Sequence, residues 1–110
     1  MTEDGLARGI ELFNQAKFFA AHEVLEDVWR GAAADDKKFF QGLTQVAVAF
    51  HHHSTGNRVG MLSVLRRAIG NLERHPAQNH PLNIPELLLC LHAWCDAIEQ
   101  DSLPPALPRM

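Results

Sequence analysis

Apolar residues recur every three or four positions along five segments of the chain, and this spacing indicates helices throughout. The first three segments span residues 3–15, 18–31 and 36–54. The fourth has its apolar stripe between Val59 and Leu72, and the last follows Asn83, a suitable capping residue. No alternation of polar and apolar residues is long enough to predict a strand. We therefore expect an all-α fold, a single compact domain of about five helices.

Short turn segments between these helices predict how they pair. A turn follows the first helix near Ala16, and Thr55-Gly56-Asn57 is a typical turn sequence after the third. A shift of 40 residues aligns Ala16 with Gly56 and Leu25 with Leu65, which resembles a helical-hairpin repeat of the tetratricopeptide kind. We expect two antiparallel helical hairpins followed by a C-terminal helix.

Prolines mark the remaining boundaries. The stretch from His75 to Pro85 contains three prolines and reads as an extended loop before the last helix. Residues 103–110 contain three more prolines and no periodicity, so we expect an extended or disordered tail there. The predicted organisation is one helical domain over residues 1–102 and a Pro-rich tail over residues 103–110.

Charge, hydrophobicity and cysteine content indicate which partners and which cellular compartment to expect. The net charge is −3, and no basic stretch exceeds Arg66-Arg67, so we expect no nucleic-acid partner. No apolar run approaches the roughly 20 residues that cross a bilayer, so we expect no membrane partner. The two cysteines, Cys90 and Cys95, are badly spaced for a disulfide within a helix, which favours a reducing compartment and a cytoplasmic protein.

The segment FFAAHEVLEDVW, residues 18–29, carries the first candidate chemical group. On a helix His22 falls among the apolar positions close to Trp29, and Glu26 lies about 40° away on its other side. A carboxylate beside an apolar face needs a partner or partial contact with water. The pattern HEVLE is not that of the zinc peptidases, which have a second histidine at the position of Glu26.

The helix over residues 36–54 carries a matching polar stripe. Gln41, Gln45 and His52 fall within about 40° of one another, while most other residues of this helix are apolar. If the stripe faces the preceding helix, its side chains converge with His22, Glu23 and Glu26. The ligand-binding residues predicted in this way are His22, Glu23, Glu26, Trp29, Gln41, Gln45 and His52.

Three uses of such a cluster remain open. It can be a polar network that fixes how helices pack, since glutamine amides both donate and accept hydrogen bonds. It can hold a divalent metal such as Zn²⁺ through His22, Glu26 and His52. It can be a catalytic pair in which Glu26 acts as base and His22 orients it.

Two other groups of residues have competing interpretations. Arg66, Arg67 and Arg74 can form an anion-binding patch, or they can simply be solvated on one helix face. The triplet from His51 to His53 ends the third predicted helix, where histidines can oppose the negative end of the helix dipole.

The motifs GIELFNQAKFFAAHEVLEDVWR, FFQGLTQVAVAFHHHSTGN and GMLSVLRRAI, within residues 9–72, together resemble the prokaryotic "domain of unknown function" family 309. The resemblance implies a compact all-helical fold and no established activity. Two positions depart from the pattern. Ala20 stands where the family commonly has an acidic residue, and Ala16 stands where glycine is common.

From these observations the leading hypothesis is a small cytoplasmic protein that binds a small molecule or partner in a polar groove between its second and third helices. One alternative is a metal-dependent hydrolase that uses His22, Glu26 and His52. Another is a structural or interaction module, which can form a homodimer and in which the polar cluster only fixes packing. Whether the protein is an enzyme is left open by the sequence.

Overall fold

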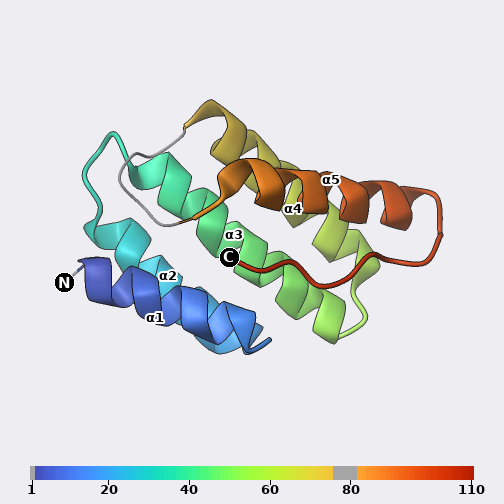
Figure 1. The fold of residues 1–110 in the computed structure, drawn as a ribbon, viewed down its shortest axis with the longest axis horizontal. Helices are drawn as coiled ribbons and strands as arrows, with labels where there is room; N and C mark the ends of the chain where they lie inside the picture. Colours follow the sequence, from blue (N-terminus) through green and yellow to red (C-terminus); the bar gives the residue numbers. More distant parts are fainter. Residues whose placement is uncertain (1, 76–81) are drawn as a thin grey trace.

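Five α-helices make up the protein in the computed structural model, which describes residues 2–75 and 82–110. They are α1 (Thr2–Asn14), α2 (Phe18–Gly31), α3 (Lys37–Ser54), α4 (Arg58–Arg74) and α5 (Ile84–Glu99) (Figure 1). The described ranges contain no strand, which confirms the predicted all-α fold. Most of the predicted loop between His75 and Pro85 lies outside the described residues.

The helices form two hairpins and one further helix, and α3 lies at the centre of the arrangement. α3 packs against α2 on one side and α4 on the other, while α1 covers α2 and α5 covers α4. Successive helices run in opposite directions (Figure 1). The predicted antiparallel hairpins are therefore confirmed as α1–α2 and α3–α4, with α5 added as the last helix.

An aromatic cluster joins the two halves of the core. The ring of Phe50 on α3 lies edge-on to Phe13 of α1 at 6.0 Å between centroids and edge-on to Trp94 of α5 at 5.1 Å. Phe18 of α2 completes the cluster, with its centroid 5.7 Å from that of Phe50. These ring contacts add to the burial of the large side chains, so α3 is held from both sides.

The turns that end α1 and α3 have the same hydrogen-bonding pattern. Ala16 and Gly56 have positive φ angles, and each donates its amide to the carbonyl three residues earlier. The next amide in each turn donates to the carbonyl five residues earlier. This is the Schellman ending of a helix, whose left-handed residue is usually glycine. The alignment of Ala16 with Gly56 in the sequence thus corresponds to two equivalent turns.

Residues 103–110 form an extended tail that crosses the front of α3 between α5 and α1 (Figure 1). The indole nitrogen of Trp94 donates to the carbonyl of Ala106 at 3.1 Å, and the amide of Met110 donates to the side-chain oxygen of Asn14 at 2.8 Å. Pro108 is buried between these two contacts. The tail is therefore tied to α5 and to α1, and Met110 packs against the hydrophobic core.

None of the helices in the described ranges is both long and apolar enough to cross a membrane.

Candidate functional site

The predicted polar cluster divides into two parts that face different neighbours. The α2 residues interact mainly along their own helix, whereas two of the α3 residues face the edge shared with α4. No contact joins His22 or Glu26 to Gln41, Gln45 or His52 among the interactions of the described residues. The predicted convergence of all six polar groups between α2 and α3 is therefore not present in the structure.

On α2, three side chains form a chain of ionic contacts. The His22 Nε2 atom lies 3.1 Å from one oxygen of Glu26, and the other oxygen accepts a hydrogen bond from Arg30 at 2.6 Å. His22 and Glu26 are each 26% exposed, so Glu26 is both paired and partly solvated. The predicted need of this carboxylate for a partner is met within one helix, because residues four apart share a face.

An exposed aromatic ring lies next to this chain. The centroid of Phe19 is 5.7 Å from that of His22 and 5.3 Å from that of His51 on α3. Phe19 is 54% exposed, so the three rings form a small patch at the surface where α2 meets α3. The α3 histidine that contacts this aromatic ring is thus His51, and not the predicted His52.

The polar stripe of α3 is attached to α4. The side-chain amide of Asn71 donates to the Oε1 atom of Gln45 at 2.8 Å, in a half-buried position. Gly42 allows this approach, since a Cβ atom there would lie 3.0 Å from the Leu72 side chain and 3.2 Å from the Asn71 Cβ. A glycine one turn from Gln45 therefore brings α4 close enough for the hydrogen bond.

Gln41 and His52, at the two ends of the stripe, make local contacts. The Oε1 atom of Gln41 accepts from the Lys38 ammonium at 3.3 Å. The Nδ1 atom of His52 lies 3.4 Å from the side-chain nitrogen of Asn57, the residue that caps α4. His52, in the last turn of α3, therefore contacts the turn that leads to α4 and no residue of the predicted site on α2.

The predicted metal ligands are not gathered. Among the side chains that the structure describes, no three His, Cys, Asp or Glu groups come together as a set that could hold a metal ion. His22 and Glu26 are adjacent, but the third predicted ligand, His52, lies in the last turn of α3 and contacts Asn57 instead. Of the other predicted site residues, Glu23 is exposed and Trp29 packs against the edge of the core.

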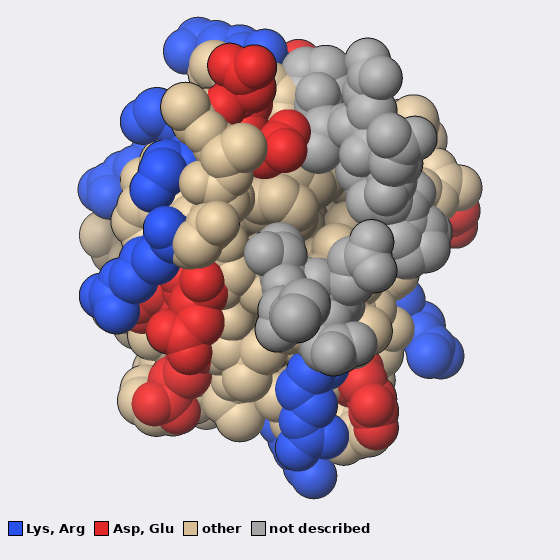
Figure 2. All heavy atoms as spheres, turned by 90° about the vertical axis from the view of Figure 1, so that its left-hand side faces the viewer, with Lys and Arg blue, Asp and Glu red and all other residues tan. Residues whose placement is uncertain are grey.

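A shallow polar groove of about 360 Å³ lies between α3 and α4, and we call it the α3/α4 groove. Its lining residues are Lys38, Gln41, Gln45, Arg66, Arg67, Gly70, Asn71 and Arg74. It thus contains four cationic side chains and three amides, and none of these lining residues is acidic. In Figure 2, Lys and Arg side chains gather along the left-hand margin of the molecule.

Most of these cations have no acidic partner. Arg66 pairs with Glu99 of α5 at 2.5 Å, and Arg67 donates instead to the Ser63 hydroxyl at 3.2 Å. Within the described part of the chain, Lys38, Arg67 and Arg74 make no ion pair. The groove therefore holds unneutralised positive charge on a chain whose net charge is −3.

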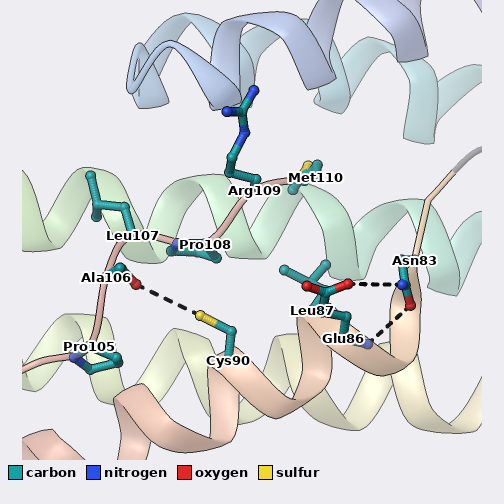
Figure 3. Close-up of a pocket in the computed structure, with 10 residues that line it drawn as sticks. All are labelled: Asn83, Glu86, Leu87, Cys90, Pro105, Ala106, Leu107, Pro108, Arg109 and Met110. Atoms are coloured by element: carbon teal, nitrogen blue, oxygen red, sulfur yellow. Dashed lines mark hydrogen bonds between the residues drawn. The ribbon is translucent and has the colours of Figure 1, made fainter.

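A second hollow, of about 480 Å³, lies between the tail and the first half of α5 (Figure 3). Its walls are mainly apolar, and its carboxylate, Glu86, accepts a hydrogen bond from the Asn83 side chain. The Cys90 thiol points at the Ala106 carbonyl at 3.8 Å, and burial raises the pKa of this thiol. Cys90 and Cys95 are both free thiols, and burial raises the pKa of Cys95 as well. Neither thiol is activated as a nucleophile.

Sequence reasoning missed Asn71 as a site residue. It lies between the apolar positions Ile69 and Leu72, which puts it near the edge of a packed helix face. The signal that could have singled it out is the small residue Gly42, which indicates a close approach of two helices beside Gln45. Lys38 gives no such signal, because a lysine near the start of a helix is usually solvated.

Comparison with known proteins identifies the family. The family model "Domain of unknown function (DUF309)" matches residues 6–64, more than half of the chain. The chain is a member of the DUF309 family. An uncharacterized protein of Aquifex aeolicus (strain VF5) is 30% identical over 91 residues, which cover 76% of this chain. The matched region is 27% of that relative, so this DUF309 chain spans only part of the relative's length. No solved structure matches the chain.

Proposed function

We propose that this DUF309 protein binds a small anionic molecule in the α3/α4 groove. The observation that carries the proposal is the orientation of two glutamines among unneutralised cations. The carbonyl oxygen of Gln41 is used by Lys38, and that of Gln45 is used by Asn71. Each amide NH₂ group is therefore left to donate to a ligand.

The ligand class follows from these donors. Arg67 and Arg74 offer planar guanidinium groups that suit carboxylate and phosphate oxygens, and Lys38 adds a third positive charge. A groove of about 360 Å³ fits a compact anion better than an extended polymer. The absence of a long basic stripe in the sequence argues in the same direction. The two free thiols accord with a reducing compartment, so we propose a cytoplasmic protein.

Calorimetric titration with inorganic phosphate, pyrophosphate and citrate at low ionic strength tests the proposal. We expect saturable binding of at least one anion, and Arg67→Gln or Arg74→Gln to weaken it about tenfold, since each removes a charge-assisted hydrogen bond. Arg109→Gln removes an exposed arginine of the tail and serves as the matched control. The side-chain amide NMR signals of Gln41 and Gln45 should shift during the titration.

Two results would overturn the proposal. One is no binding of any of the three anions at millimolar concentration. The other is equal weakening by the control, which would indicate attraction to charge in general rather than to this groove.

A packing role is the second candidate for the α3 stripe, and the hydrogen bond between Gln45 and Asn71 supports it. The two roles predict different losses. Gln45→Leu should weaken anion binding with little change in melting temperature if recognition dominates, and should mainly lower the melting temperature if packing dominates.

A further inference from the structure

The outer side of the α4–α5 pair carries an apolar groove of about 570 Å³, which we call the α4/α5 groove. Val59, Leu62 and Ile98 line it, and Val59 is 83% exposed. A β-branched apolar side chain this exposed, next to two partly buried ones, gives a cluster of the kind found at interaction surfaces. The groove is separate from the polar stripe of α3.

Ion pairs between the two helices lie along this groove. Arg58 donates to Asp101 at 2.6 Å and to the carbonyl of Ile98 at 3.0 Å. Further along, Arg66 pairs with Glu99 at 2.5 Å. In both pairs the cation comes from α4 and the anion from α5 or the turn after it.

The same separation of charge holds for the whole of each helix. α4 contains four arginines and one glutamate, whereas residues 84–101 contain four acidic residues and no lysine or arginine. One edge of the groove is therefore basic and the other is acidic, with apolar side chains between them. Two copies of such a surface are complementary when one is rotated by 180° about an axis parallel to the groove. The basic edge of each copy then faces the acidic edge of the other.

We infer that the α4/α5 groove is a homodimer interface with a two-fold axis parallel to these helices. This axis places α4 of one copy against α5 of the other. It also brings together the apolar strip of each copy, formed by Val59, Leu62 and Ile98. Arg58 of each copy then faces Asp101 of its partner. A two-fold axis across the helices would instead oppose α4 to α4 and place arginines against arginines, which is unfavourable.

Sedimentation velocity of the full chain, from micromolar to millimolar concentration, tests the inference. We expect a species of twice the chain mass at the upper end of the range. Val59→Glu should raise the dimer dissociation constant by about 100-fold or more, because it puts an unpaired charge into the apolar strip. Leu89→Glu, which alters a 73% exposed leucine of α5 outside the groove, should change it by less than about twofold.

A charge-exchange experiment tests the orientation. Arg58→Glu and Asp101→Arg should each sediment as a monomer, because each homodimer would oppose like charges. An equimolar mixture of the two variants should recover the dimer, since every facing pair is again opposite in sign. Both residues are largely exposed, and circular dichroism checks that the variants fold.

A wild-type protein that stays monomeric over the whole concentration range would overturn the inference, and the groove would then be a candidate site for a different partner. A dimer that tolerates Val59→Glu, or a mixture that stays monomeric, would overturn it equally. Arg66 lines both the α4/α5 groove and the α3/α4 groove and is unchanged in all of these variants. The test of dimer formation is therefore independent of the test of anion binding.

Discussion

Ala16 and Gly56 occupy equivalent positions in the turns that end α1 and α3, with φ angles of 61° and 78°. Gly56 adopts this left-handed conformation at no steric cost, whereas the Cβ atom of Ala16 is crowded by it. Ala16 also stands where the family resemblance leads one to expect glycine. The structure thus supplies the physical reason for glycine at this position: the turn needs a residue with positive φ.

We predict that Ala16→Gly stabilises the protein. Relief of the left-handed strain should exceed the added entropy of the unfolded chain and raise the free energy of unfolding by about 0.5–1 kcal/mol. Ala20→Gly, inside α2, is the matched control and should lower it by about 0.5–1 kcal/mol. Urea titration measures both changes. A loss of stability in Ala16→Gly would contradict the strain argument.

The close approach of α3 and α4 gives a second prediction. Gly42→Ala should lower the free energy of unfolding by about 1 kcal/mol, because overpacking against Leu72 and Asn71 exceeds the gain in helix propensity. Gly70→Ala, in α4, meets no atom within 4 Å and should raise it by up to about 1 kcal/mol. Equal gains from both substitutions would show that α3 and α4 are not tightly packed at Gly42.

The two halves of the polar cluster should differ in their contribution to stability. His22→Ala should cost less than about 1 kcal/mol, because Glu26 keeps Arg30 and contact with water. Asn71→Ala should cost about 1–2 kcal/mol, because it leaves the half-buried Gln45 oxygen without its donor. Thermal unfolding of the two variants in parallel makes the comparison. A larger loss of stability in His22→Ala than in Asn71→Ala would indicate that His22 has a packing role that these contacts do not explain.

Burial raises the pKa of the Cys95 thiol in the folded protein, and this predicts a pH effect. The unfolded chain loses its thiol protons from about pH 8.5 upward while the native state keeps them, so stability should be intact below that pH and fall above it. Urea titrations between about pH 7.5 and pH 9.5 measure the fall. A Cys90→Ala/Cys95→Ala variant should lose less stability over this pH range. A loss equal to that of the wild type would exclude the thiols as the cause.

The helices were predictable because each carries its own signal. Apolar spacing located all five, and the side chain of Asn83 accepts from the Glu86 amide at the start of α5, as its position suggested. The pairing of helices into hairpins also followed from short turns. These are local properties, and periodicity expresses them directly.

The site was predicted only in part, since helical spacing fixes which residues share a face but not which helix that face meets. Gln41 and Gln45 do share a face, as expected, yet their neighbour is α4 instead of α2. The choice depends on how close each pair of helices comes, and Gly42 largely determines this for α3 and α4. His22 found its ionic partner within its own helix, so no second helix was needed.

The tail also bears on the order in which the protein folds. Its contact between Asn14 and Met110 joins residues 96 positions apart, whereas each hairpin closes over a short turn. Because loop-closure entropy rises with the logarithm of loop length, closing this loop costs about 3 kcal/mol more than closing a hairpin turn, and contacts between distant residues slow folding. We therefore expect the hairpins to form first and the tail to dock last. Until it docks, Trp94 lacks the acceptor for its indole N–H, so its fluorescence should report this final step separately from helix formation.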